Sequence, residues 1–127
     1  MNKAIFDTRF FAELYYSQDE QLKKKIKSRK TQRGNYVSAV VIHEMYKFAL
    51  ARGGREIAKN IVTDLIEDFE IIPVDQQIAQ VSAELSHKYR LSMGDSIIAA
   101  TAYILKAICI TDDPHFKQIK EIQTAWI

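Results

Sequence analysis

Acidic residues stand just after two short apolar runs of this chain, where they could act together on a cation or a phosphate. Asp7 follows "KAIF", residues 3–6, and Asp112 and Asp113 come just after "AICI", residues 107–110. Short apolar runs bounded by polar turns are typical of buried strands. In an open parallel sheet, the carboxyl ends of the strands face the crevice where ligands bind. We therefore expect these acids to share one edge of a sheet.

Two further acids belong to helices that would enter from the same edge. Glu44 lies six residues after Ser38, a plausible N-cap, and so falls in the second turn of its helix. Asp95 stands at the start of the helix predicted in "LSMGDSIIAATA". Ser92 and Asp95 also fit a capping box, and an anion suits the positive end of a helix dipole. Capping and chemistry are both open for Asp95 at this point.

Each of these acids also has a purely structural interpretation as a cap, a surface residue or a turn former. Four carboxylates gathered at one edge would repel one another, and a hard divalent cation relieves that repulsion. Mg²⁺ and Mn²⁺ prefer oxygen ligands, so such a site needs no histidine or cysteine. An acidic site for Mg²⁺ or Mn²⁺ is one hypothesis, and four unrelated structural roles are the other.

The elements that must position the acids alternate between strand and helix. Apolar runs predict strands at 3–6, 69–74, 107–110 and 122–127, and a strand that begins in 35–40 and turns at Ser38. Helical spacing and caps predict helices at 8–16, 19–30, 38–52, 55–68, 75–89 and from 92 onward. This alternation predicts an α/β fold, a parallel twisted sheet of about five strands flanked by helices. We expect one domain, residues 1–127.

The composition favours a globular protein without a membrane segment. Hydrophobic residues make up 47% of the chain and charged residues 27%, which is ordinary for soluble domains. Three apolar residues before Asp7 are too few for a signal peptide, and the apolar run at 96–105 is too short to span a bilayer. The lone Cys109 is expected as a buried strand thiol. We therefore expect a cytoplasmic location.

Four segments carry a resemblance to a known family: "IFDT", "SAVVIHE", "GDSIIAATA" and "ITDDPHF". In this order, and across essentially the whole chain, they resemble the PIN-domain ribonucleases. The resemblance is strongest to the VapC-type toxins of prokaryotic toxin–antitoxin pairs. It implies hydrolysis of RNA at Mg²⁺ or Mn²⁺, with 5′-phosphate and 3′-hydroxyl products. It also implies a cognate antitoxin as partner and a homodimer.

Carried over residue by residue, the acidic site of the family maps onto Asp7, Glu44, Asp95 and the Asp112–Asp113 pair. The resemblance implies that Asp7 and Asp95 bind the metal directly or through water. Glu44 and Asp113 would complete the cluster, orient waters or hold a second ion.

Two threonines and the acidic pair need separate assignment. Thr8 and Thr111 match hydroxyls that support the acids in such sites. The family commonly has a threonine, any residue, and then Asp or Asn, a pattern that selects Asp113 as the fourth acid. Asp112 is then a bystander or a partial substitute.

A basic segment stands apart from an otherwise acidic chain. Residues 20–33 carry seven Lys or Arg and one acid, a net charge of +6, which leaves a net charge of −4 for the remainder. On a helix, Lys23, Lys27 and Lys30 fall along one stripe. This stripe could guide RNA, face solvent only, or dock an acidic antitoxin segment.

A histidine and several aromatic residues could have functional roles, but structural roles are at least as compatible with their positions. His115 follows the acidic turn, where substrate contact and simple surface placement are both open. The aromatic residues of the first helix are expected in the core or a subunit interface rather than in a base-stacking platform: Phe10, Phe11, Tyr15 and Tyr16.

Two rival functions share this fold class. A phosphoacceptor signalling domain needs an acidic pair after its first strand, where "IFDTRF" has one acid. It also needs an acceptor Asp after a central strand, where Pro73 interrupts "IIPVDQQ". A catalytically idle PIN-fold interaction module is the other rival, and the retained set of acids argues against it.

Overall fold

Strands and helices alternate along the chain, in the order that the sequence predicts. The computed structural model describes residues 3–30 and 34–127. Its elements are β1 (Ala4–Phe6), α1 (Thr8–Tyr16), α2 (Glu20–Lys30), β2 (Asn35–Ser38), α3 (Ala39–Asp68), β3 (Glu70–Ile72), α4 (Gln76–Tyr89), α5 (Met93–Leu105), β4 (Ile108–Ile110), α6 (Pro114–Lys117) and β5 (Thr124–Ala125).

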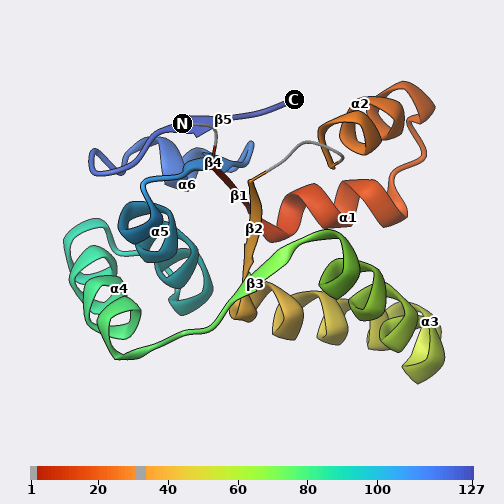
Figure 1. The fold of residues 1–127 in the computed structure, drawn as a ribbon, viewed down its shortest axis with the longest axis horizontal. Coiled ribbons are helices and arrows are strands. Elements are labelled where there is room, and N and C mark those ends of the chain that lie inside the picture. Colours follow the sequence, from red (N-terminus) through yellow and green to blue (C-terminus); the bar gives the residue numbers. More distant parts are fainter. Residues whose placement is uncertain (1–2, 31–33) are drawn as a thin grey trace.

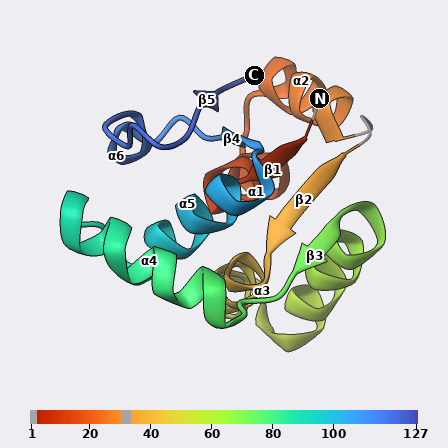
Figure 2. The ribbon, with the colours of Figure 1, turned by 60° about the vertical axis from the view of Figure 1, so that its left-hand side comes forward.

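The five strands form one parallel sheet in the order β3-β2-β1-β4-β5, and Figure 2 shows them one after another. In Figure 1, α4 and α5 lie to the left of β1 and β2, whereas α1, α2 and α3 lie to their right. The predicted α/β class, a parallel sheet of about five strands flanked by helices, is confirmed. The chain fills β1, β2 and β3 and then crosses back to β4, so the strand order reverses between β1 and β4. In open α/β sheets, ligands commonly bind at the carboxyl ends of the strands where the order reverses.

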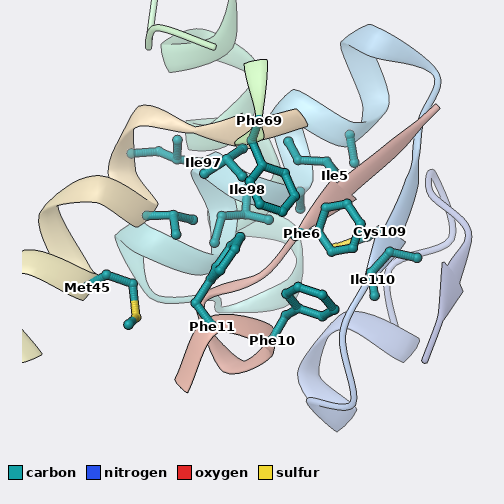
Figure 3. Packing of buried hydrophobic residues seen from close by; sticks show 14 of the residues in the cluster. Ile5, Phe6, Phe10, Phe11, Met45, Phe69, Ile97, Ile98, Cys109 and Ile110 are labelled. Atoms are coloured by element: carbon teal, nitrogen blue, oxygen red, sulfur yellow. The ribbon is translucent and has the colours of Figure 1, made fainter. Parts of the chain in front are cut away.

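An aromatic cluster anchors β1 and α1 in the core (Figure 3). The ring of Phe6 lies 4.6 Å from that of Phe10 and 5.3 Å from that of Phe69, measured between centroids. Phe11 meets the same Phe69 ring edge-on at 5.1 Å. Phe10 and Phe11 are therefore core residues, in agreement with the interpretation from sequence. Cys109 on β4 is also fully buried, as expected for a strand thiol.

Residues close in the sequence determine where the long helix α3 begins and where it is interrupted. Ser38 caps α3, and its side chain accepts a hydrogen bond from the N–H of Val40 at 3.2 Å. Gly54 interrupts α3 with φ 83° and ψ −177°, a left-handed conformation that suits glycine because it has no Cβ. The two helices predicted on either side of Gly53-Gly54 are thus present as two arms of α3. No helix among the described residues is both long and apolar enough to cross a bilayer.

The C-terminal region differs from the prediction in two places. The strand expected over 122–127 is confined to Thr124–Ala125, because β4 has only three residues with which to pair. The segment expected as a turn contains the short helix α6. Asp113 caps it by accepting the N–H of His115 at 2.9 Å, and Pro114 occupies the first helical position, where its missing N–H costs nothing.

Candidate functional site

Asp7 lies at the reversal point of the sheet, where the ends of β1 and β4 meet. The register pairs Phe6 with Ile110, so the residues that follow each strand lie side by side. The Thr111 hydroxyl donates a hydrogen bond to Asp7 Oδ2 at 2.7 Å. The backbone N–H of Thr8 donates to Asp7 Oδ1, also at 2.7 Å, as Asp7 caps α1. Both carboxylate oxygens of Asp7 are therefore held in place.

Burial makes the charge of Asp7 unfavourable. Its residue is only 3% exposed, and burial is the main reason that the pKa of Asp7 rises from 3.8 to about 6. The carboxylates of Asp95 and Asp113 raise this pKa further, whereas the hydrogen bonds from Thr111 and Thr8 lower it. The fold thus keeps an acid where a nearby cation would favour its ionised form.

Asp95 lies in the first turn of its helix and also faces the other acids. Ser92 is the N-cap of α5, and its hydroxyl oxygen accepts the Asp95 N–H at 3.3 Å, as the capping box predicts. The pKa of the half-buried Asp95 is raised first by burial and then by the carboxylates of Asp113 and Glu44. Helix α5 packs across β1, β2 and β4, so its start reaches the edge where Asp7 lies. Asp95 therefore lies both at the start of α5 and beside the other acids.

Glu44 connects the first turns of α1 and α5. The hydroxyl of Thr8 donates a short hydrogen bond to Glu44 Oε1. The other oxygen, Oε2, would lie 2.3 Å from a Cβ placed on Gly94. Because glycine has no Cβ, the carboxylate of Glu44 can rest against the start of α5. Gly94 has no role predicted from the sequence, although a glycine beside Asp95 in a first helical turn was a usable signal.

Asp113 and His115 complete a compact group with Asp95. The N–H of Asp113 donates to Thr111 Oγ1 at 3.1 Å, which orients the start of the turn. The Nδ1 atom of His115 lies 2.9 Å from Asp113 Oδ1. One ligand atom each from Asp95, Asp113 and His115 lies within 4.8 Å of the others. The ring of His115 is exposed and also lies beside the acids. Substrate contact and simple surface placement therefore both remain compatible with its position.

Asp112 has a different partner from Asp113. Its carboxylate pairs with the guanidinium of Arg9 on α1, through a short contact of Nε with Oδ1 and a 3.3 Å hydrogen bond from Nη2 to Oδ2. Asp112 does not belong to the group formed by Asp95, Asp113 and His115, and neither do Asp7 and Glu44, but Asp7 and Glu44 are linked to the site through Thr8 and Thr111. Arg9 has no role predicted from the sequence, because its partner lies 103 positions away.

The donor set fits a hard divalent cation. The acids come from the ends of β1 and β4, the second turn of α3 and the first turn of α5. The carboxylates of Asp95 and Asp113 raise the pKa of Asp7, and those of Asp113 and Glu44 raise the pKa of Asp95. Carboxylate oxygens with at most one imidazole nitrogen are ligands that suit Mg²⁺ or Mn²⁺. A cation among them would remove the repulsion that the fold imposes on the acids.

The predicted basic stripe lies on α2, which packs against α1. Lys23 is half-buried and Lys27 is exposed. The side chain of Lys30 lies outside the described residues, so the stripe itself stays a prediction.

Comparison with known proteins identifies the family. The sequence profile of the PIN domain matches residues 4–122. The chain belongs to the PIN-domain family. No curated protein matches it.

Solved structures of toxin–antitoxin proteins share the fold. A toxin–antitoxin complex from Klebsiella pneumoniae is 26% identical to the chain, with a TM-score of 0.75, and the match covers 98% of this chain and 100% of that one. DNA-bound VapBC from Salmonella typhimurium is 17% identical, with a TM-score of 0.81 and coverage of 99% and 98%. VapC20 of Mycobacterium tuberculosis, a sarcin–ricin loop cleaving toxin, is 16% identical, with a TM-score of 0.76 and coverage of 91% and 94%. The predicted resemblance to VapC-type PIN proteins is confirmed.

Proposed function

We propose that this protein is a ribonuclease that hydrolyses RNA phosphodiester bonds with Mg²⁺ or Mn²⁺. The observation that carries the proposal is the convergence of Asp7, Glu44, Asp95 and Asp113 at one sheet edge. Asp7 shares Thr8 with Glu44 and Thr111 with Asp113 as hydrogen-bond partners, and neighbouring carboxylates raise the pKa of Asp7 and of Asp95. Membership of the PIN-domain family supports the same chemistry.

The proposed roles follow from where each side chain is held. Asp7 and Asp95 are the ligands of the ion, directly or through water, while Glu44 and Asp113 complete the cluster or orient waters. Thr8 and Thr111 hold the carboxylates in place through their hydrogen bonds. A bound divalent ion would lower the pKa of a coordinated water and offset charge that builds on the phosphate. The products would carry a 5′-phosphate and a 3′-hydroxyl.

We also propose that the protein is the toxin of a toxin–antitoxin pair. Solved structures with the same fold are described as toxin–antitoxin complexes, which supports a cognate antitoxin as the protein partner. A homodimer and a cytoplasmic location belong to the same proposal. The RNA target is not carried over, because the relative that cleaves the sarcin–ricin loop is only 16% identical.

Cleavage of a fluorogenic oligoribonucleotide tests the ribonuclease proposal. We expect cleavage with Mg²⁺ or Mn²⁺, loss of cleavage in EDTA, and recovery when Mg²⁺ is added in excess. Asp95→Asn, purified in the same way, controls for contaminating nucleases. Cleavage that persists in EDTA, or that Asp95→Asn retains, would contradict the proposal.

The same preparations separate the two rival functions. An idle interaction module would leave RNA intact with every divalent ion tested. A phosphoacceptor domain would instead gain the mass of a phosphoryl group when incubated with acetyl phosphate and Mg²⁺. The structure disfavours the latter, because Thr8 rather than a second acid follows Asp7 at the end of β1.

The basic stripe has a separate test, since it lies outside the acidic cluster. We propose that Lys23, Lys27 and Lys30 guide RNA through non-specific phosphate attraction. Changing all three to Gln would then weaken RNA binding and flatten its dependence on salt, with little change in the turnover of bound substrate. Unchanged affinity at low salt would leave a solvated helix or an antitoxin-docking helix as the explanation.

A further inference from the structure

The ion pair between Arg9 and Asp112 leaves part of the guanidinium open. Arg9 uses its Nε and Nη2 atoms to contact the two oxygens of Asp112. A guanidinium has five N–H donors in one plane, so this pairing uses one edge and leaves three donors. No described residue accepts a hydrogen bond from those three. The Arg9 side chain is 53% exposed, and the open edge can therefore receive a ligand from solvent.

This cation stands at the rim of the acidic site. Arg9 lies in the first turn of α1, two residues after Asp7, and Asp112 precedes Asp113 in the turn after β4. The pKa of Arg9 is raised by Asp112 first, and also by Asp113 and Asp7. The guanidinium is thus within electrostatic reach of two proposed metal-site acids without hydrogen-bonding to either.

A fixed guanidinium in this position suits a phosphate. The free edge of an arginine can donate two parallel hydrogen bonds to phosphate oxygens, which a lysine cannot do. Asp112 holds the plane of the guanidinium before any ligand arrives, which lowers the entropy lost on binding. The neighbouring acids repel a polyanion, so a cation beside them would offset that repulsion.

We propose that Arg9, positioned by Asp112, binds a backbone phosphate of the RNA strand next to the bond that is cleaved at the acidic site. This inference rests on the proposed ribonuclease function. The competing interpretation is a surface ion pair that only ties α1 to the turn after β4. Exposed pairs of that kind contribute little to stability, which makes the two interpretations separable by experiment.

Two assays on the purified protein test this proposal. Fluorescence anisotropy of a short fluorescein-labelled oligoribonucleotide in EDTA measures RNA affinity without cleavage. Cleavage of the same RNA in Mg²⁺ gives KM and kcat. We expect Arg9→Gln to weaken affinity and raise KM about tenfold, the usual effect of losing a charged hydrogen-bond pair, with kcat within about twofold. Arg9→Lys should recover part of the loss, because it keeps the charge but not the planar fork.

Two further variants separate a phosphate contact from bulk charge and from fold stability. Lys88→Gln removes one positive charge from an ion pair of similar exposure, 58% for Lys88, whose partner Glu121 lies outside the acidic site. We expect it to leave RNA affinity unchanged. Asp112→Asn breaks the same ion pair as Arg9→Gln but keeps the cation and removes a negative charge that repels RNA, so we expect a smaller loss of affinity than in Arg9→Gln. Thermal unfolding of each variant checks that the fold persists.

Each outcome tests either the contact between Arg9 and a phosphate or the proposed ribonuclease function. Equal losses of RNA affinity in Arg9→Gln and Lys88→Gln would mean that Arg9 acts only through the net charge of the protein. Equal losses in Arg9→Gln and Asp112→Asn would mean that the ion pair has only a structural role. Cleavage by the wild type with an unchanged KM in Arg9→Gln would overturn the phosphate contact alone. RNA binding that depends on Arg9, in a protein that cleaves no RNA, would support the contact and overturn the ribonuclease proposal. A wild type that neither binds nor cleaves RNA would overturn both.

Discussion

Phe6 and Asp7 are neighbours in sequence and are both buried, yet burial has opposite consequences for them. Phe6 is fully buried and packs against Phe10 and Phe69, where removal from water stabilises the fold. Asp7 is 3% exposed, and its burial raises its pKa to about 6, so the ionised form destabilises the folded chain. The end of β1 therefore separates the aromatic core, which stabilises the fold, from the acidic cluster, whose ionised carboxylates destabilise it.

This difference shows how the fold can hold repelling acids together. The aromatic cluster packs β1 and α1 together, and this packing keeps Asp7 beside Thr111 although Asp95 and Asp113 oppose its charge. A site that relaxed freely would let the carboxylates separate. The core thus compensates for the electrostatic cost of holding these carboxylates close together.

The largest expected effect is a loss of stability when an aromatic ring of the core is removed. Phe10→Ala removes a fully buried ring and should lower the free energy of unfolding by about 3–5 kcal/mol. Urea denaturation with Mg²⁺ and with EDTA measures it. A loss below about 1 kcal/mol would mean that the aromatic cluster does not support β1 and α1, and would contradict the view that the core holds the acids in place.

Asp7→Asn should act in the opposite direction. Below pH 3.8 the carboxyl of Asp7 is protonated in folded and unfolded chains, and between 3.8 and about 6 only the folded chain retains the proton. Stability of the metal-free protein therefore falls as the pH rises through this range, by up to about 3 kcal/mol. At pH 8 in EDTA, Asp7→Asn should be more stable than the wild type by up to that amount. Urea denaturation at pH 5 and pH 8 measures both, and a wild type equally stable at both values would contradict the expectation.

Asp95→Asn should abolish cleavage while sparing the fold. Asparagine lacks the charge but suits a helix start, so the free energy of unfolding should change by less than about 1 kcal/mol. The cleavage rate should fall at least about 100-fold, since charge stabilisation by a metal site contributes several kcal/mol. Asp75→Asn is a matched control, because Asp75 caps α4 through a 2.9 Å hydrogen bond from the N–H of Ile78 and is not part of the acidic group. Cleavage near the wild-type rate in Asp95→Asn would leave Asp95 with a structural role at the start of α5 only.

The acidic pair after β4 allows a finer contrast. At limiting Mg²⁺ we expect Asp113→Asn to lower kcat/KM about tenfold and Asp112→Asn to lower it less. The reason is that Asp113 lies beside Asp95, whereas Asp112 is paired with Arg9. Titration of cleavage rate against Mg²⁺ measures the order, and the reverse order would place the fourth acid one residue earlier.

The smallest expected effect concerns Gly94. An alanine there would place its Cβ 2.3 Å from Glu44 Oε2, and the flexible end of Glu44 would move away at little cost. Thermal stability should not fall, because alanine is favoured over glycine in a helix, while cleavage should drop about threefold through displacement of the carboxylate. In a Glu44→Ala background the drop should vanish. A drop that persists there would show that Gly94 acts on something other than Glu44.

Local sequence patterns predicted much of the fold. The caps at Ser38, Asp75 and Ser92, the break at Gly53-Gly54 and the alternation of strands with helices all depend on residues close in the chain. The edge at which the acids gather could also be anticipated, because parallel strands end on the same side. The resemblance to PIN domains added the choice of Asp113 over Asp112 as the fourth acid, which the placement of Asp113 near Asp95 supports.

Contacts between distant segments were beyond such patterns. The hydrogen bond from Thr8 to Glu44 spans 36 positions, and the pairing of Arg9 with Asp112 spans 103. Periodicity and capping describe neighbours within a turn or two and carry no information on which side chains meet across the sheet. The amino-acid order alone thus determined the kinds of elements and the set of acids. Packing of α1, α3 and α5 against the strands decided which acid faces which partner, because only packing sets the distances over which carboxylates repel and hydrogen bonds form.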